Sequence, residues 1–395
     1  MRDIFFKHIA QTSPAPIGLE IVKAEGIYQY DTSGKKYLDL ISGFSVANIG
    51  HSHPEVIKAV QQQAEKYMHL IVYGEFIEAP QTEYAKLLVQ YLPPALDCIY
   101  FTNSGTEATE GALKLAKRAT NRTNIIAFNK SYHGSTQGAL SVMGDEYYRN
   151  AFRPLLPGIL HTDYNREEVF GLINETTACV ILETIQAESG ITVPSKEWMQ
   201  QLRNKCTEQG TLLILDEIQA GFGRTGTLWA FEQFDIVPDI LLLGKALGGG
   251  MPLGAFIANK NLMQTLSFNP VLGHITTFGG HPVSCAAGKA AFEVLLQNSY
   301  ILNVKKKEAF LIEQLQHRFV KKINHFGLWA SLKFPSEEIA QNIIHKCVAK
   351  GLITDWFLFA PDRLRIAPPL IIQEHEIEEA CKIILSAIDE SGYSA

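Results

Sequence analysis

Five short apolar segments recur through the middle of the chain, and a glycine, a polar turn or a helical pattern follows each of them. These segments are residues 98–101, 125–128, 178–182, 212–215 and 240–243. Their hydrophobicity is continuous rather than alternating, which is typical of strands that are covered on both faces in a mostly parallel sheet. The pattern therefore predicts an α/β fold in which helices cover one large sheet.

The two ends of the chain have a different pattern. Residues 27–40 predict a β-hairpin, and Ser52 is positioned to cap a following helix. Beyond about residue 290 the spacing of apolar residues becomes helical. A chain of 395 residues is long enough for more than one domain. We expect an N-terminal segment at residues 1–48, a large domain at 49–290 and a C-terminal α+β domain at 291–395.

Composition limits the class of protein. The net charge of −6 provides no basic field, which argues against a partner that is a nucleic acid or an anionic membrane. No uncharged apolar run approaches the length that crosses a bilayer, and the N-terminus carries charges where a signal peptide needs an apolar stretch. The six cysteines have neither metal-ligand nor redox spacing. We therefore expect no metal site, and free thiols in a reducing cytoplasm.

Charged residues follow three of the predicted strands at the point where each strand ends. Glu183 follows the third segment, Asp216 and Glu217 follow the fourth, and Lys245 lies just beyond the fifth. Because ligands of open α/β sheets gather beyond the carboxyl ends of strands, we expect these side chains on one rim. Strand ends also meet solvent, where a charge costs little, but three such ends together favour a functional site.

A candidate phosphate site follows the first segment. Ser104 and Glu107 have the spacing of a capping box at the start of a helix, and Gly105 between them lets a ligand approach the backbone. Free backbone N–H groups at such a helix start can hold a phosphate. An ordinary N-cap has the same sequence, so this signal gains its weight from the charged rim.

Two nucleotide-binding interpretations fail. Residues 212–217 (LLILDE) look like a Walker B strand, but the Gly-Lys pairs that begin at 34, 244 and 288 lack the G-x-x-x-x-G-K-[ST] context of a P-loop. No G-x-G-x-x-G follows an early strand, which argues against a Rossmann dehydrogenase. Pyridoxal phosphate (PLP) instead needs a lysine, a carboxylate beside the pyridine nitrogen and a phosphate cup, and the chain offers all three.

Four longer motifs carry a resemblance to a known family. They are residues 103–117 (NSGTEATEGALKLAK), 213–226 (LILDEIQAGFGRTG), 238–254 (PDILLLGKALGGGMPLG) and 276–282 (TTFGGHP). Over nearly its whole length the chain resembles the class III (subgroup II, fold type I) PLP-dependent aminotransferases, close to the acetylornithine and ornithine aminotransferase branch. The resemblance implies a large PLP-binding domain and a small α+β domain formed by the N- and C-terminal segments.

The resemblance also implies how the cofactor is held. Lys245 would form the Schiff base with PLP, and Asp216 would pair with the pyridinium nitrogen. Tyr132 would stack on the ring, and Gln219 would lie near the phenolic oxygen. The phosphate contacts would come from Ser104, Gly105 and Thr106.

On the substrate side, Arg365 matches the arginine that binds the substrate α-carboxylate, a task for which bidentate pairing suits arginine. Glu188 matches the glutamate that pairs with this arginine when a substrate lacks that carboxylate. Thr277 would reach the phosphate of the neighbouring subunit's cofactor, and Thr276 would border the substrate entry. The active site would therefore belong to a homodimer.

Ser135 departs from the family pattern. Acetylornithine and ornithine enzymes usually carry an arginine at this position, where it holds the donor's carboxylate, and its loss removes roughly 1.5–3 kcal/mol per hydrogen bond. We therefore expect an aminotransferase that moves an amino group from an ω- or diamine-type primary amine to an α-keto acid such as 2-oxoglutarate, by a ping-pong mechanism. The alternatives are an acetylornithine or ornithine aminotransferase proper, a racemase, aminomutase or decarboxylase of the same fold, and a non-catalytic relative.

Overall fold

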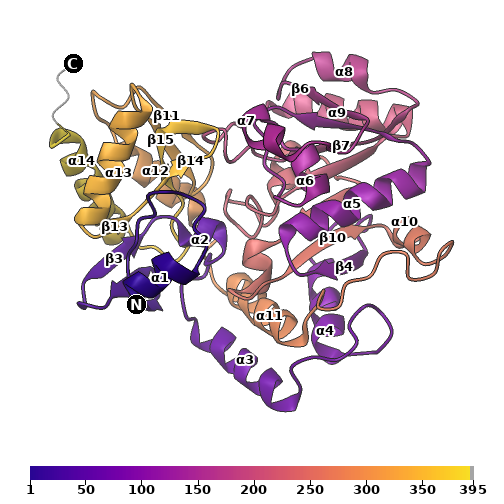
Figure 1. Ribbon diagram of the computed structural model, residues 1–395, viewed down its shortest axis with the longest axis horizontal. Helices are drawn as coiled ribbons and strands as arrows, with labels where there is room; N and C mark the ends of the chain where they lie inside the picture. Colours follow the sequence, from indigo (N-terminus) through magenta and orange to yellow (C-terminus); the bar gives the residue numbers. More distant parts are fainter. Residues whose placement is uncertain (392–395) are drawn as a thin grey trace.

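The computed structural model describes residues 1–391 and has a larger and a smaller lobe (Figure 1). The larger lobe is built on a seven-stranded sheet with the order β4-β10-β9-β8-β7-β5-β6. All five predicted strands are present in it, together with β6 and β10, which the apolar segments did not predict. The strands are β4 (Cys98–Thr102), β5 (Asn124–Phe128), β6 (Ile159–Thr162), β7 (Thr177–Glu183), β8 (Leu212–Asp216), β9 (Ile240–Leu243) and β10 (Gly254–Ala258).

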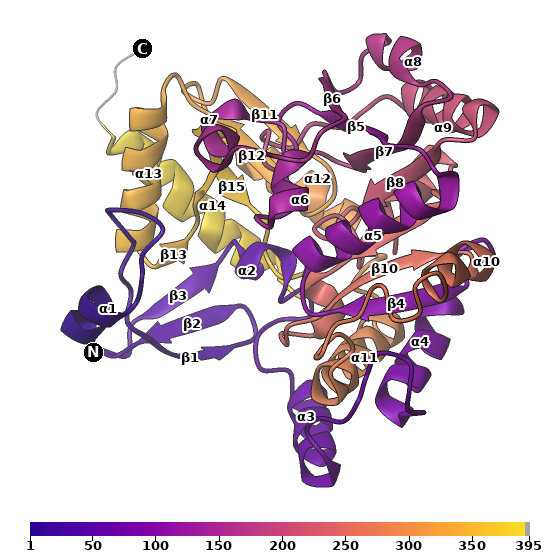
Figure 2. The same ribbon diagram turned by 45° about the vertical axis from the view of Figure 1, so that its right-hand side comes forward.

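The sheet is mostly parallel, as predicted. β6, β5, β7, β8 and β9 run parallel to one another, whereas β10 is antiparallel to both of its neighbours. Adjacent residues of the central strands pack in opposite layers: Ile181 lies with α5 (Gly105–Thr120), and Leu182 lies with α9 (Lys196–Gln209) (Figure 2). Every residue of β7 is buried, which explains the continuous hydrophobicity of these segments.

The smaller lobe joins both ends of the chain. β13 (Leu352–Ile353) runs parallel to β3 (Lys36–Asp39) in a sheet with the order β1-β2-β3-β13, and a second sheet has the order β11-β12-β15-β14. The predicted hairpin is the antiparallel pair β2 and β3. The small α+β domain made from both termini is therefore confirmed. Its other strands are β1 (Ile21–Glu25), β2 (Tyr28–Asp31), β11 (Lys322–His325), β12 (Ala330–Lys333), β14 (Trp356–Phe357) and β15 (Ala360–Ile366).

The remaining elements are helices. The α-helices are α1 (Arg2–His8), α2 (Ser42–Ser45), α3 (Pro54–Lys66), α4 (Ala79–Val89), α6 (Gln137–Ser141), α7 (Glu146–Arg149), α8 (Glu168–Leu172), α10 (Lys260–Met263), α11 (Pro282–Gln297), α12 (Val304–Gln314), α13 (Glu337–Ala349) and α14 (Glu374–Asp389). Short 3₁₀ helices are η1 (Asn150–Phe152), η2 (Ala230–Phe234), η3 (Lys245–Gly248) and η4 (Gln264–Leu266). The domain boundary expected at 290 falls within α11, and both boundaries remain predictions. No helix among residues 1–391 is long and apolar enough to cross a membrane.

The predicted cap of α3 is wrong by one residue. His53 is the N-cap, and its Nδ1 accepts a hydrogen bond from the backbone N–H of Glu55 at 3.3 Å. Ser52 instead has a φ of 53° and donates its hydroxyl to the carbonyl of Ala24 at 2.8 Å. A contact between segments that are distant in the sequence has therefore replaced the local cap.

Candidate active site

A cavity of about 300 Å³ lies at the carboxyl ends of β7 and β8, beside the start of η3. We call it the active-site cavity. It gathers side chains from several loops of the larger lobe, as the strand-end argument predicted. Eight of the twelve predicted site residues line it: Gly105, Thr106, Tyr132, Ser135, Glu188, Asp216, Gln219 and Lys245.

Lys245 is the first residue of η3, directly after the strand β9 and Gly244. Its φ of 50° is left-handed, a conformation that costs free energy in a residue with a side chain and is often found at functional sites. Its Nζ donates to Oε1 of Gln219 at 3.0 Å. Burial lowers the pKa of Lys245 and Arg365 adds to that effect, whereas Glu188 and Asp216 oppose it. The net lowering makes this amine easier to deprotonate than an ordinary lysine.

Asp216 ends β8 and is held from two sides. Its Oδ1 accepts from the backbone N–H of Ile218 at 2.9 Å, and its Oδ2 lies 2.7 Å from Nδ1 of His133. Both Asp216 and His133 are buried. The sequence did not predict a role for His133, although it stands between Tyr132 and Gly134 in a motif that was singled out.

The two other acidic residues predicted at strand ends, Glu183 and Glu217, differ in whether they line the active-site cavity. Glu183 lies opposite Asp216 in the sheet register and lines the active-site cavity. Burial, with the nearby Asp216, raises the pKa of Glu183 to about 8, although the backbone N–H groups of Ala187 and Tyr132 donate to it. Glu217 does not line the cavity: its carboxylate accepts from the backbone N–H groups of two η2 residues and from Thr184. Of the two neighbouring acids Asp216 and Glu217, only Asp216 therefore lines the active-site cavity.

The predicted phosphate-binding residues lie at the start of α5. Gly105 and Thr106 are its first two residues and line the cavity. A Cβ at Gly105 would lie 2.7 Å from Cδ1 of Ile218, and a Cβ at Gly134 would lie 2.2 Å from Oγ1 of Thr106. These glycines allow a close approach of backbone to neighbouring side chains. At this end of the 16-residue helix α5, the first backbone N–H groups have no partner within the helix.

The predicted capping box is only half formed. Ser104 is the N-cap, and its Oγ accepts from the N–H of Glu107 at 3.4 Å. The carboxylate of Glu107 does not return to Ser104. It accepts instead from the backbone N–H of Asn103 at 2.9 Å and from the side-chain amide of Asn103. Ser104 itself does not line the active-site cavity.

Arg365 is fully buried on β15 and makes a bidentate pair with Glu188. Its two terminal nitrogens lie 2.9 and 2.8 Å from the carboxylate oxygens of Glu188, and its Nε lies 2.9 Å from Oδ1 of Asp355. Burial opposes the charge of Arg365, but the two carboxylates outweigh it and raise the pKa of Arg365. Burial raises the pKa of Asp355 to about 6 despite the arginine. The sequence missed Asp355, because only the partner arginine belonged to a motif.

A strained turn lies against this arginine. Residues 42–45 all have positive φ values, between 47° and 67°, so that α2 is not a regular right-handed helix. Left-handed backbone costs roughly 1–2 kcal/mol per residue for residues other than glycine. The turn places the Phe44 ring 5.1 Å from the guanidinium carbon of Arg365, and Phe357 lies at 4.2 Å from the same atom.

The remaining predicted residues lie outside the cavity. Thr276 accepts a hydrogen bond from the amide of Asn103 at 2.9 Å, close to the start of α5. Thr277 is exposed on the segment that precedes α11. Neither lines the active-site cavity within this chain. Ser135 does line it, and its hydroxyl lies 3.1 Å from the hydroxyl of Tyr132.

The fold and this site define a PLP-dependent enzyme of the aminotransferase type, and comparisons with known proteins agree. The family model "Aminotransferase class-III" matches residues 9–388. An acetylornithine aminotransferase of Methanopyrus kandleri is 37% identical over 390 residues, covering 98% of this chain and 97% of the relative. An acetylornithine aminotransferase of Bacillus subtilis is 38% identical over 376 residues, covering 94% and 95%.

Solved structures are similar over the same length. An ornithine aminotransferase from Toxoplasma gondii has a TM-score of 0.91 at 28% identity, covering 100% of this chain and 96% of its own. An (S)-enantioselective omega-transaminase from Thermomicrobium roseum has a TM-score of 0.92 at 27% identity, covering 99% and 98%. The chain belongs to the class III aminotransferases and is a PLP-dependent transaminase of fold type I.

The described residues fit PLP. Besides the lysine, the aspartate and the helix start, two of the eight buried side-chain atoms that lack a hydrogen-bond partner in residues 1–391 are found here: Nε2 of His133 and Nε2 of Gln219. Both residues line the active-site cavity. Because an unpaired buried donor costs free energy, these atoms mark a place where a polar ligand belongs.

Proposed function

We propose that this enzyme transfers the amino group of a terminal primary amine to 2-oxoglutarate, alternating with glutamate in the second half-reaction. The observation that carries the proposal is the bidentate pair of Glu188 and Arg365 beside the active-site cavity. With the pair closed, Arg365 is neutralised and the cavity accepts a donor whose amine end carries no carboxylate. When Glu188 swings away, Arg365 can hold the α-carboxylate of glutamate or 2-oxoglutarate in the same geometry.

The roles of the other residues follow from their positions. Lys245 would be the attachment point of PLP. Once a substrate amine has displaced it, its lowered pKa would let it carry the proton between the two carbons that flank the amine nitrogen. Asp216, fixed by His133, would keep the ring nitrogen protonated. Gln219 and Tyr132 would contact the ring, and the backbone of Ser104, Gly105 and Thr106 would hold the phosphate. PLP itself supplies the electron sink of the reaction.

The lining of the cavity indicates the donor. Among the residues that line it, Lys245 is the only lysine or arginine, and a serine occupies position 135. No cation besides the attachment lysine is therefore available from this lining to a donor's distal carboxylate. We infer an ω- or diamine-type donor with an uncharged or cationic distal end, such as putrescine.

Acetylornithine is the second candidate donor. The curated relatives at 34–38% identity carry the name acetylornithine aminotransferase, which supports this candidate better than it supports a diamine. Ser135 argues in the opposite direction. The pocket and the relatives therefore favour different donors, and a direct comparison separates them.

We further propose a homodimer that shares its active sites. Large apolar side chains are exposed at residues 68–77 and 268–278, among them Ile77 at 98% exposure and Val271 at 72%. The two segments touch, because the rings of His69 and Phe278 are 4.6 Å apart. A contiguous exposed apolar patch of this kind is typical of a protein interface. It includes Thr277, which would reach the partner's cofactor. Light scattering of the PLP-loaded protein tests this, and a monomeric mass would contradict it.

The state of the cysteines is relevant to the cellular compartment of the protein. Each of the six is a free thiol, and five of them are buried. Reduced thiols are typical of the cytoplasm, which we propose as the compartment. Oxidised cysteines in protein isolated from its host would contradict this.

The function is tested by a donor screen. Glutamate alone should convert the yellow PLP-loaded enzyme to its colourless amine form, and failure to bleach would contradict the role of Arg365. Putrescine, 4-aminobutyrate, ornithine and acetylornithine are then compared with 2-oxoglutarate as acceptor. In Ser135→Arg, kcat/KM for acetylornithine should rise about tenfold relative to putrescine, the value of one charge-assisted hydrogen bond. A wild-type enzyme that prefers acetylornithine would favour the second candidate.

A further inference from the structure

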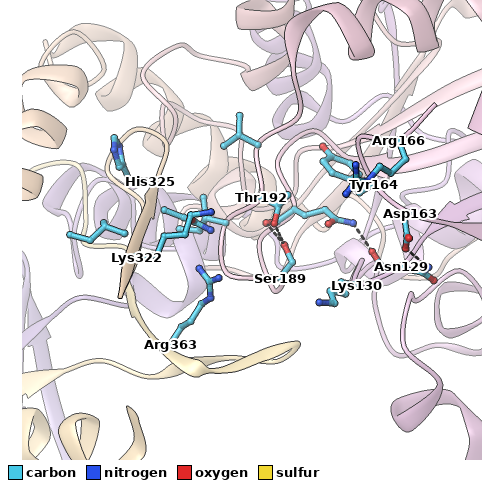
Figure 3. A pocket seen from close by; sticks show the side chains of 15 residues that line it. Asn129, Lys130, Asp163, Tyr164, Arg166, Ser189, Thr192, Lys322, His325 and Arg363 are labelled. Atoms are coloured by element: carbon cyan, nitrogen blue, oxygen red, sulfur yellow. Dashed lines mark hydrogen bonds between the residues drawn. The ribbon is translucent and has the colours of Figure 1, made fainter. Parts of the chain in front are cut away.

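A second cavity, of about 710 Å³, lies between the two lobes and shares no lining residue with the active-site cavity. On the larger lobe it is bounded by the loops that follow β5, β6 and β7, and on the smaller lobe by β11 and β15. Figure 3 shows Lys322 and Arg363 on one side, Lys130 and Arg166 on the other, and Ser189 and Thr192 between them. We call it the cation-lined cavity.

Positive charges outnumber negative ones in the lining of this cavity. Lys130, Arg166, Lys322 and Arg363 line it, and Asp163 is the only carboxylate among its lining residues. Within residues 1–391, the side chains of Lys130, Arg166 and Lys322 form no ion pair. The whole chain has a net charge of −6, so this local excess of cations opposes the overall balance. A cleft lined by one sign of charge concentrates ions of the other sign.

The least exposed of these cations is poorly satisfied. The contacts of the Arg363 guanidinium are long: 3.4 Å to the carbonyl of Gly190, 3.3 Å to Oγ of Ser331 and 3.8 Å to Asp362. The side chain of Arg363 is only 12% exposed, and this burial lowers the pKa of Arg363. A guanidinium that is largely buried and weakly paired has hydrogen-bonding capacity left for a ligand.

The other lining residues supply acceptors and donors as well. Ser189 and Thr192 share a hydrogen bond of 2.7 Å, and Oδ1 of Asp163 accepts from the amide of Asn129 at 2.7 Å. These groups lie on the larger lobe, beside Lys130. Ile191, Val193 and Ile323 are the aliphatic residues of a lining that is otherwise mostly polar, and an apolar ligand or an apolar segment of another protein does not match it.

We propose that the cation-lined cavity binds a small multivalent anion, with acidic groups at both ends, that bridges Lys130 and Arg166 of the larger lobe to Lys322 and Arg363 of the smaller lobe. An anion with at least two acidic groups can pair with the cations of both walls at the same time. Arginine pairs bidentately with either kind of anion, so phosphoryl compounds and polycarboxylates share the required chemistry.

The proposal is tested by calorimetric titration of the PLP-loaded enzyme with inorganic tripolyphosphate and with citrate, at constant ionic strength set by sodium chloride. Binding of tripolyphosphate alone identifies a phosphoryl ligand, and binding of citrate alone identifies a polycarboxylate. Lys130→Gln and Lys322→Gln should each weaken binding about fivefold, the upper range for one exposed ion pair. Lys321→Gln is the matched control, because Lys321 is exposed next to Lys322 but does not line the cavity.

Two results would overturn the proposal. One is that neither anion binds more tightly than chloride. The other is that Lys130→Gln and Lys322→Gln bind with the affinity of Lys321→Gln, which would place the anion elsewhere, for instance on Arg365. All three substitutions exchange an exposed lysine for a glutamine, so a common loss of folding does not mimic the expected pattern.

Discussion

The active-site cavity and the cation-lined cavity hold their charges in opposite ways. At the first, each buried charge has a partner in this chain: Lys245 with Gln219, and Arg365 with both Glu188 and Asp355. At the second, Lys130 and Lys322 are exposed, and neither forms an ion pair within the described residues.

This difference separates two ways of using a cation. A buried charge that loses its partner costs several kcal/mol, so the active-site cavity can function only by exchanging one partner for another. An exposed lysine costs little when it stands alone, and each contact that it makes with a ligand is worth at most about 1 kcal/mol. Substitutions should therefore have large effects in the first cavity and small effects in the second.

The largest effect is expected from Lys245→Ala. The substitution removes both the attachment point of PLP and the group that moves the proton, and a proton-transfer group alone contributes about 10²–10⁴-fold. We expect the rate of glutamate bleaching to fall at least about 10⁴-fold. Lys321→Ala, an exposed lysine, should keep the wild-type rate. A Lys245→Ala enzyme that retains full speed would refute the assignment of the site.

Glu188→Gln should have an intermediate effect, on preference rather than on total activity. The amide carries no negative charge, so glutamate binds the arginine without displacing a carboxylate, while a terminal amine meets an arginine whose charge only Asp355 still balances. The ratio of kcat/KM for glutamate to that for putrescine should rise about tenfold. Asp355→Asn is the control: it removes a partner of Arg365 that does not line the cavity, and it should lower thermal stability with little change in this ratio. Equal ratios in both variants would contradict the exchange of partners.

How well the sequence predicted each part depends on whether the cause was local. Continuous apolar segments and the residues that end them are local features, and they placed Asp216 and Lys245 on one rim correctly. β10 was missed because its five residues belong to a glycine-rich stretch; it pairs antiparallel with the nearby β9 and also with β4, which is more than 150 residues away. The pairing with a distant strand such as β4 leaves little trace in the sequence pattern of β10 itself.

The same distinction explains the missed site residues. His133 matters through a hydrogen bond to Asp216, which lies 83 positions further along the chain. Phe44 approaches Arg365 only because residues 42–45 adopt a left-handed turn, and no propensity predicts a turn of that kind. Ser104 was predicted correctly as a cap because a cap needs only its own helix, whereas Ser52 lost that role to a distant carbonyl.

The smallest expected effect is an influence of an anion in the cation-lined cavity on substrate binding in the active-site cavity. This expectation rests on the proposed function. Ser189 of the loop that follows β7 lines the cation-lined cavity, whereas Glu188 of the same loop closes the active-site pair. Arg363 lies against this loop at Gly190, where a Cβ would come within 2.5 Å of its Cδ. Asn324 also donates to the carbonyl of Gly190, at 2.8 Å, and holds this loop in part. We expect an anion that draws Arg363 away from Gly190 to loosen the loop partly and to make the closed pair of Glu188 and Arg365 easier to open.

Saturating tripolyphosphate or citrate should therefore lower KM for glutamate about twofold and raise KM for putrescine by a similar factor. The value of kcat should not change, because only the equilibrium between the closed and the open pair of Glu188 and Arg365 shifts. Lys322→Gln should need a higher anion concentration for the same change, and Glu188→Gln should show no change, since it has no closed pair to open. Steady-state kinetics at constant ionic strength measure both constants. Opposite shifts of the two KM values would establish the connection through the loop, whereas shifts in the same direction would mean that the anion competes directly at Arg365.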